Sequence, residues 1–317
     1  MPLTRRPDVL VLAAGGTLGE AWMRGLLDGA GAVTGIDFRD CEYFVGTSAG
    51  SIVASFLAAG REPDSGAEAR AAQKWADAAE SNGAPGGPGA AGGPFSEAAS
   101  AGGPSAGPLA AVARLGLTAA TPFAPLALSA GAPGGAVARA AALAAVPRPQ
   151  RSLPGLARLV EQSGAEFDGR LRIVAVDRRN GRRVVFGAPG SPPATVAQAV
   201  LASCSIPWVF APVEIDGREY VDGGVWSPTN LDATPAGRGT EVLCLNPTAA
   251  FRPLSRVSNA AALTESLALR ARGARVHTIR PDPAAAAVMG PNLMDRGRTS
   301  EALAAGYAQG RALASRE

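Results

Sequence analysis

The sequence predicts an α/β fold with a mostly parallel central sheet between helical layers. Two short apolar runs, 9–14 and 43–45, each lead through a glycine-containing turn into a helix-like stretch. Late in the chain, the apolar runs 242–245 and 276–279 flank another helix-like segment, 263–272. Continuous apolar runs are typical of parallel strands that are buried on both faces, and alternation with helices indicates crossover connections in one sheet.

The first turn follows the first apolar run directly and has the sequence Gly15-Gly16-Thr17-Leu18-Gly19. Such a turn leaves backbone N–H groups at a helix N-terminus, where they can bind an anion or a developing oxyanion. A dinucleotide site is the rival interpretation, because Asp37 lies at a suitable distance along the chain for a ribose contact. The G-x-G-x-x-G spacing is missing and no G-K-[ST] follows, which favours the oxyanion interpretation.

The second turn is Gly46-Thr47-Ser48-Ala49-Gly50, a G-x-S-x-G motif between a predicted strand and a predicted helix. At such a junction the glycines remove side chains that would clash in a sharp turn, and the helix start lies beside any oxyanion that forms. The same residues also suit a small-residue turn in an ordinary α/β unit. We predict that Ser48 is a nucleophile.

A third segment, Glu219-Tyr220-Val221, leads into Asp222-Gly223-Gly224 and so puts a carboxylate at the end of a predicted strand. This carboxylate is a candidate general base, because burial would raise its pKa and make it a better proton acceptor. Two other acids lie nearby. Asp216-Gly217 has the form of a hairpin turn, and we expect Asp232 to cap a helix or face solvent.

The chain has a single histidine, His277, so every Ser-His-Asp triad must use it. The order Ser48, Asp222, His277 matches that of the α/β-hydrolases, which keeps a triad esterase open as an alternative. His277 lies in an alternating, strand-like stretch, where a lone histidine is more often a structural or surface residue.

Taken together, the glycine-rich turn, the G-x-S-x-G near residue 50 and the late D-G-G resemble the patatin-like phospholipases. Residues 202–213 and 217–225 and the tripeptide Pro228-Thr229-Asn230 are similar to the second core block of that family, and the resemblance spans roughly residues 8–247 apart from a divergent middle. It implies an acyl hydrolase that uses a Ser-Asp dyad, no histidine and no cofactor. Its substrate would be a lipid or another acyl ester.

The resemblance assigns roles position by position. Ser48 would be the nucleophile, Asp222 the general base, and the N–H groups of Gly15, Gly16 and Thr17 the oxyanion hole. The other glycines of the motifs are Gly19, Gly46, Gly50, Gly223 and Gly224.

Two residues of the first turn depart from the family pattern G-G-G-x-[RK]-G. Ala14 stands in the first position and Leu18 in the basic one. Leu18 removes a charge that could orient an anionic substrate, and Ala14 would strain the turn if its φ were positive. The altered turn keeps open a second class of function, a non-catalytic lipid-binding or regulatory protein on the same fold.

The resemblance implies one catalytic domain over residues 8–247, completed by a C-terminal strand and helices at 248–317. Within it, residues 81–150 form a low-complexity or lid-like insertion. Residues 81–108 are rich in Gly, Pro, Ala and Ser, which predicts a loop, whereas 109–117 and 136–146 are compatible with helices. An apolar insertion between nucleophile and base would suit a lid or an acyl-chain site, and a neutral expansion of Ala/Gly-rich sequence is the alternative.

Charge, cysteine content and hydropathy limit which binding partners and which cellular compartment we expect. A net charge of +3 is too small to indicate nucleic-acid binding. Cys41, Cys204 and Cys244 are widely spaced in apolar segments, which predicts buried free thiols in a reducing compartment and no metal site. No stretch is long enough to cross a bilayer, so we expect a cytoplasmic protein whose membrane contact, if any, is peripheral. The sequence does not indicate an oligomeric state.

Overall fold

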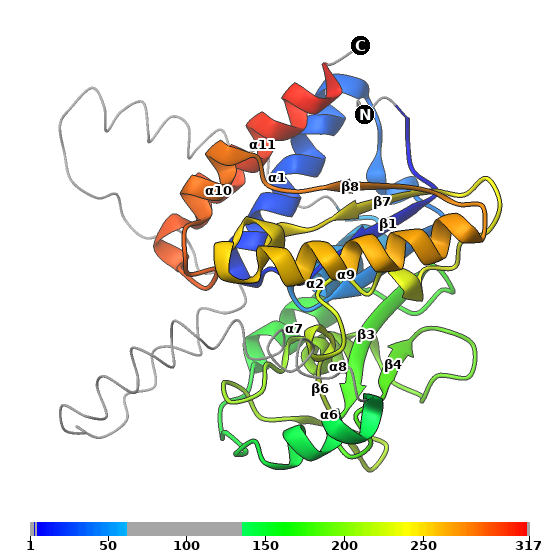
Figure 1. The fold of residues 1–317 in the computed structure, drawn as a ribbon, viewed down its shortest axis with the longest axis vertical. Helices are drawn as coiled ribbons and strands as arrows, with labels where there is room; N and C mark the ends of the chain where they lie inside the picture. Colours follow the sequence, from blue (N-terminus) through cyan, green and yellow to red (C-terminus); the bar gives the residue numbers. More distant parts are fainter. Residues whose placement is uncertain (1–2, 4, 62–134, 316–317) are drawn as a thin grey trace.

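A computed structural model describes residues 3, 5–61 and 135–315 of the chain (Figure 1). The predicted loop 81–108 and the predicted helix 109–117 lie outside the described residues. The centre of the fold is an eight-stranded sheet. Its strands are β1 (Val9–Leu12), β2 (Tyr43–Thr47), β3 (Leu171–Asp177), β4 (Arg183–Phe186), β5 (Val213–Ile215), β6 (Arg218–Asp222), β7 (Glu241–Leu245) and β8 (Arg275–Ile279).

The sheet is mostly parallel, which confirms the predicted fold class. Its hydrogen-bonded order is β5-β6-β3-β2-β1-β7-β8, and β4 also pairs with β3. The strands β3, β2, β1, β7 and β8 run parallel to one another, whereas β4, β5 and β6 pair in antiparallel fashion. Both strands that precede the predicted turns, β1 and β2, therefore end at the same edge of the sheet.

Helices cover both faces of the sheet, but unequally. The described helices are α1 (Gly16–Thr34), α2 (Ala49–Ala58), α6 (Gly135–Ala144), α7 (Pro154–Ser163), α8 (Val196–Cys204), α9 (Arg252–Ala271), α10 (Pro283–Met289) and α11 (Thr299–Ala314). The short 3-10 helices are η1 (Phe38–Asp40), η4 (Gly223–Val225), η5 (Leu231–Ala233), η6 (Pro247–Ala250) and η7 (Arg296–Arg298).

The strand β1 shows how the two faces differ. Leu10 and Leu12 point into the larger core, which α1, α2, α7, α8, α10 and α11 complete, while Val9 and Val11 point into a smaller core. The long helix α9 covers that second face with Leu269, and Figure 1 shows it running alongside β7 and β8. Because both faces are buried, the central strands read as continuous apolar runs.

The C-terminal helix α11 packs directly against α1, backbone to backbone. A Cβ atom at Gly25 or Gly29 of α1 would meet carbonyl oxygens of α11, and one at Gly306 or Gly310 of α11 would meet carbonyl oxygens of α1. Only glycine permits this close approach. The residues that follow the family-like region thus pack onto the first helix, and the domain boundaries at 8–247 and 248–317 stay a prediction.

Most predicted elements are present at the expected positions. The helix α8 begins at a capping box in which the Thr195 hydroxyl and the Gln198 side chain each bind the other residue's backbone N–H. The predicted hairpin at Asp216-Gly217 is confirmed, with positive φ angles of 50° and 69° at its two central residues. The helix α10 and the early start of α9 at Arg252 were not predicted.

Candidate active site

The G-x-S-x-G motif forms a strained turn with Ser48 at its tip. Ser48 has φ 53° and ψ −125°, and it lies between the end of β2 and the start of α2. A non-glycine residue in this conformation persists only where its surroundings hold it. Gly46 and Gly50 make that possible, since a Cβ atom at Gly46 would lie 2.5 Å from Ser51 Cα and one at Gly50 would meet the carbonyl oxygen of Leu12. Side chains there would push the turn off the sheet.

A buried serine of α8 holds the backbone of the turn. The N–H of Ser48 donates to Ser203 Oγ at 2.8 Å, and the Ser203 hydroxyl donates in turn to the Val174 carbonyl at 2.7 Å. This N–H is therefore not free to bind a developing oxyanion. In the sequence, Ser203 belongs to the family-like block 202–213, and no local pattern indicates its role.

The pairing of β3 explains how Asp222 reaches Ser48. Val174 pairs with β4 on one side and with Thr47 of β2 on the other, while the next residue, Ala175, pairs with β4 and with Asp222 of β6. Since β4 occupies one edge of β3 along both residues, β2 and β6 share the opposite edge. They approach from opposite directions, so their carboxyl ends meet head to head.

A glycine allows the two strand ends to pack closely together. A Cβ atom at Gly223 would meet the Val174 carbonyl oxygen and lie 3.2 Å from Thr47 Cγ2. The N–H of the following residue, Gly224, donates to Asp222 Oδ1 at 2.6 Å. The D-G-G motif thus fits β6 against β2 with its first glycine and orients the carboxylate with its second.

Asp222 is only 1% exposed, and the Ser48 side chain is near enough to lower the pKa of its carboxyl group. Burial raises the pKa of Asp222 to about 7, and Ser48 and the hydrogen bond from the Gly224 N–H lower it only in part. The two residues come from segments far apart in the sequence. The structure brings this predicted pair together.

The glycine turn after β1 lies beside the same junction. Its N-cap is Gly15, and Gly16 begins α1 with a positive φ of 59°. Within the described parts of the chain, the N–H groups of Gly15, Gly16 and Thr17 donate to no acceptor, whereas that of Leu18 donates to the Leu293 carbonyl at 2.9 Å. The three N–H groups that the resemblance assigned to an oxyanion hole thus have no acceptor among the described residues.

Segments from later in the chain pack against the glycine turn. A Cβ atom at Gly16 would lie 2.8 Å from the Leu293 carbonyl oxygen and 2.9 Å from Met294 Sδ. Gly15 and Gly19 both pack under Pro247, which would lie 3.0 Å from a Cβ atom at Gly19. The glycines let η6, which follows β7, and the segment after α10 pack directly against the turn.

The two departures from the family pattern have simple structural explanations. Ala14 is absent from the described residues with positive φ, because the left-handed conformation falls on Gly16 instead. Leu18 is fully buried in the larger core. A basic side chain at position 18 would be buried among apolar groups, so the leucine suits this turn.

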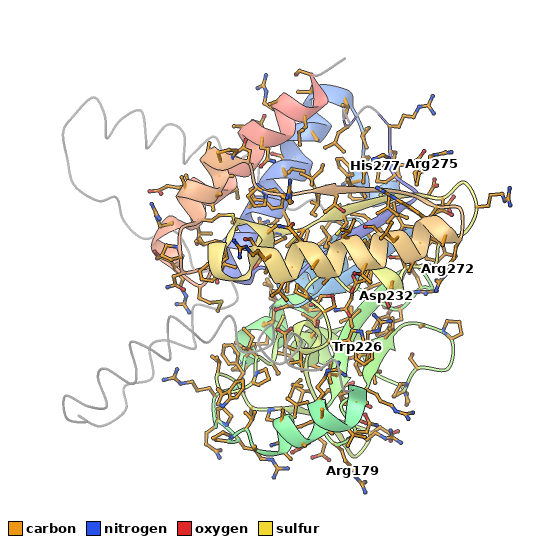
Figure 2. All side chains as sticks on the ribbon, viewed as in Figure 1. Arg179, Trp226, Asp232, Arg272, Arg275 and His277 are labelled. Atoms are coloured by element: carbon orange, nitrogen blue, oxygen red, sulfur yellow. The ribbon has the colours of Figure 1, made fainter. Side chains whose placement is uncertain are left out.

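The structure does not bring His277 to Ser48. His277 lies on the edge strand β8, level with Phe44 of β2, and its Nε2 is 3.6 Å from a carboxylate oxygen of Glu241. Three strand spacings of about 4.8 Å and four residues of about 3.3 Å separate it from Ser48, which amounts to roughly 20 Å. Figure 2 shows His277 beside Arg275 and away from Trp226, which follows the D-G-G turn. The triad alternative is wrong.

The other acidic residues considered as candidate bases or ribose ligands have structural roles. Asp216 forms the hairpin turn, and Asp232 forms an ion pair with Arg183 whose two contacts are 2.5 and 3.0 Å long. Asp37 caps η1 and pairs with Arg39, which lowers the pKa of Asp37. Arg39 donates to both carboxylate oxygens of Asp37, and the dinucleotide interpretation loses its support.

Cysteines and potential metal ligands are unremarkable. Cys41, Cys204 and Cys244 are buried free thiols, as predicted. Among the described residues, no group of three or more His, Cys, Asp or Glu side chains could hold a metal ion. None of the described helices is long and apolar enough to span a bilayer.

Comparison with known proteins identifies the family. The sequence model of the patatin-like phospholipase family matches residues 10–234, and the chain belongs to that family. None of the curated proteins matches it. Among solved structures, the chain is similar to VipD from Legionella pneumophila, with 16% sequence identity and a TM-score of 0.42 over 98% of this chain and 67% of the VipD chain. Family membership indicates a lipid acyl hydrolase and a lipid substrate.

Proposed function

We propose that the protein is a serine acyl hydrolase that cleaves carboxylic esters of lipids with Ser48 as the nucleophile and Asp222 as the general base. The observation that carries this proposal is the buried Asp222 carboxylate, which lies where the end of β6 meets the Ser48 turn and has its pKa raised to about 7. A base whose pKa lies near neutral pH combines a large ionised fraction with a strong tendency to accept a proton. A carboxylate can then do the work of an imidazole.

The reaction would proceed through an acyl-enzyme. Ser48 Oγ attacks the ester carbonyl carbon while its proton passes to Asp222, and the resulting oxyanion binds the free N–H groups of Gly15, Gly16 and Thr17. As the tetrahedral intermediate collapses, the ester C–O bond breaks and the leaving alcohol takes the proton from Asp222. Water then attacks the acyl-enzyme with Asp222 as base, and the proton returns to Ser48 as the fatty acid leaves. The chemistry requires no cofactor.

A lipid hydrolase must also reach a lipid surface, and we propose that α9 makes a peripheral contact with it. Leu263 and Leu267 lie one turn apart on α9 and are 58% and 55% exposed. The exposed Arg256 and Arg270 accompany them on the same helix, and the exposed Arg272 follows at its C-cap. Apolar side chains next to cations suit the boundary between acyl chains and anionic headgroups. The buried free thiols support a reducing compartment such as the cytoplasm.

Co-sedimentation with vesicles that contain anionic phospholipid tests this surface. We expect the double variant Leu263→Ser/Leu267→Ser to lose binding. The control is Val137→Ser, which changes a side chain that is 81% exposed on another helix, α6, and should bind as the wild type does. Equal binding by all three proteins would contradict the α9 contact.

Covalent labelling with a fluorophosphonate, read by intact mass, tests the proposed chemistry. Labelling should be lost in Ser48→Ala, slowed by at least about 100-fold in Asp222→Asn, and unchanged in His277→Ala. A folded wild type that binds lipid vesicles but is never labelled would favour the non-catalytic lipid-binding alternative.

The pH dependence of labelling gives a second test. Asp222 must be ionised to accept a proton, and its pKa is raised to about 7. The labelling rate should therefore fall as the pH decreases through about 7 and level off above it. A rate that is independent of pH between 5 and 9 would contradict Asp222 as the base.

A further inference from the structure

The loop between the D-G-G turn and η5 contains a buried, strained asparagine that the proposed chemistry does not use. Asn230 is fully buried and has φ 47° and ψ 33°, one of the few described non-glycine residues with positive φ. Asparagine tolerates this left-handed conformation better than most residues, but the surroundings must still hold it there.

The side-chain amide of Asn230 joins the backbone neighbours of both proposed dyad residues. Its Nδ2 lies 3.2 Å from Thr47 Oγ1, 3.1 Å from the Gly223 carbonyl and 2.6 Å from the Ser227 carbonyl. Thr47 directly precedes Ser48, and Gly223 directly follows Asp222. A single amide thus spans the point where the ends of β2 and β6 meet.

The orientation of the amide is set by a cation. Arg183 Nη1 donates to Asn230 Oδ1 at 3.3 Å, and the same guanidinium forms the ion pair with Asp232. Because Arg183 can only donate, the oxygen of the amide faces the arginine and the NH₂ group faces the strand ends.

A carboxylate of α9 holds the residues on both sides of Asn230. Glu265 Oε2 accepts a hydrogen bond from the Thr229 hydroxyl at 2.5 Å and one from the Leu231 N–H at 2.7 Å. Burial and the nearby Asp232 carboxylate raise the pKa of Glu265, and the hydrogen bonds of the loop oppose that shift. A carboxylate clamped to positions 229 and 231 fixes the backbone of position 230 between them.

We infer that Asn230 is a positioning residue that keeps Ser48 and Asp222 within hydrogen-bond distance, and that Glu265 keeps Asn230 in place. This inference rests on the proposed function. The ends of β2 and β6 are also held by their separate pairings with β3 and by the end of α8, where Ser203 binds the Ser48 N–H and the Ser205 carbonyl accepts from the Asp222 N–H. Asn230 adds a side-chain link between the two ends themselves, and a displacement of about 1 Å between reacting groups can cost about 100-fold in rate.

Hydrolysis of a soluble p-nitrophenyl ester by the full chain tests the inference. Asn230→Asp keeps the shape of the side chain but removes its N–H donors, so we expect kcat to fall roughly 10- to 100-fold with KM nearly unchanged. The matched control is Asn259→Asp on α9, a partly exposed residue outside the site, which should behave as the wild type does.

The pH profile separates positioning from a general loss of stability. Ser48 lowers the pKa of Asp222, so a variant that moves Ser48 away should shift the midpoint of the profile upward from about 7. The new carboxylate of Asn230→Asp would itself raise the pKa of Asp222, so the midpoint is read in Glu265→Ala, which adds no negative charge. Among the described residues with a shifted pKa, the Cys204 thiol responds to the charge of Asp222, and burial raises the pKa of this thiol well above the ordinary value. Cys204 therefore stays neutral and cannot cause the shift.

The Glu265 variants test the second half of the inference and do not depend on the folding of Asn230→Asp. Glu265→Gln keeps an oxygen acceptor for Thr229 and Leu231, whereas Glu265→Ala removes it. We expect Glu265→Gln to retain most of kcat and Glu265→Ala to lose roughly 10-fold with an upward shift of the midpoint. Wild-type kcat and midpoint in Glu265→Ala would overturn the role of Glu265, and a wild-type kcat in folded Asn230→Asp would overturn the role of Asn230.

A failure of the inference can be told apart from a failure of the proposed function. If the wild type hydrolyses the ester and Ser48→Ala does not, the dyad chemistry stands whatever the Asn230 and Glu265 variants do. If the wild type has no activity that depends on Ser48, the proposed function fails, and the positioning role of Asn230 fails with it.

Discussion

The two glycine turns of this protein have the same local design but opposite uses. Each follows a buried parallel strand, β1 or β2, and each begins a helix. In the first turn the left-handed conformation falls on Gly16, and the neighbouring N–H groups have no acceptor in the part of the chain that the structure describes. In the second it falls on Ser48, whose N–H is bound by Ser203. One turn presents backbone donors, and the other presents a side chain.

The difference shows where each turn depends on its glycines. In the second turn, Gly46 and Gly50 let a strained serine sit against the end of the sheet. In the first turn, Gly15 and Gly16 let later segments of the chain close over the helix start. Substitutions should therefore impair folding in the second turn and catalysis in the first.

The largest effect is expected for Gly50→Ala. The new methyl group would meet the backbone of Leu12 and Ala13, which cannot move without breaking the pairing of β1. We expect a loss of at least about 3 kcal/mol in the free energy of unfolding, measured by urea denaturation. The control is Gly237→Ala, where a methyl group has no neighbour within 4 Å. A Gly50→Ala protein as stable as the wild type would show that the second turn does not need its glycines for folding.

Gly16→Ala should have a smaller effect on stability and a larger one on rate. The left-handed φ costs alanine roughly 1 to 2 kcal/mol, and the contact with Leu293 would shift the free N–H groups. Loss of one oxyanion donor lowers kcat by about 10²- to 10³-fold. Gly35→Ala is the matched control, since Gly35 also has positive φ and ends the same helix in open space. It should lose similar stability and keep its kcat.

If Gly35→Ala lost as much activity as Gly16→Ala, the backbone strain alone would explain both results. The free N–H groups of the first turn would then have no special role. Titration with a phosphonate inhibitor would sharpen the distinction, because only Gly16→Ala should weaken binding of the tetrahedral anion.

Ser203→Ala should have the smallest effect of the three. It leaves the buried N–H of Ser48 without an acceptor, which costs roughly 1 to 3 kcal/mol of stability. The control is Ser55→Ala in α2, a buried serine whose hydroxyl donates only to the Ile52 carbonyl of its own helix. Urea denaturation should separate the two variants by about 1 kcal/mol, and equal stabilities would show that the Ser48 N–H finds another partner.

The sequence by itself determined the elements that carry the site. The apolar run before each turn predicted a buried strand, and the glycine spacing predicted which residue each turn would present. Asp216-Gly217 predicted a hairpin, which removed Asp216 from the candidate bases. These features are local, because turn chemistry and strand burial depend on residues close together in the chain.

The tertiary structure alone decided which residues meet. The head-to-head meeting of β2 and β6 on one edge of β3 follows from two non-local pairings, Thr47 with Val174 and Ala175 with Asp222, which join positions 127 and 47 residues apart. It brings Asp222 to Ser48 while leaving His277 on a distant edge strand. The roles of Ser203 and Asn230 arise the same way, from hydrogen bonds that cross 155 and 183 residues of sequence. A buried polar group takes whatever partner the fold brings to it, and no local pattern specifies that partner.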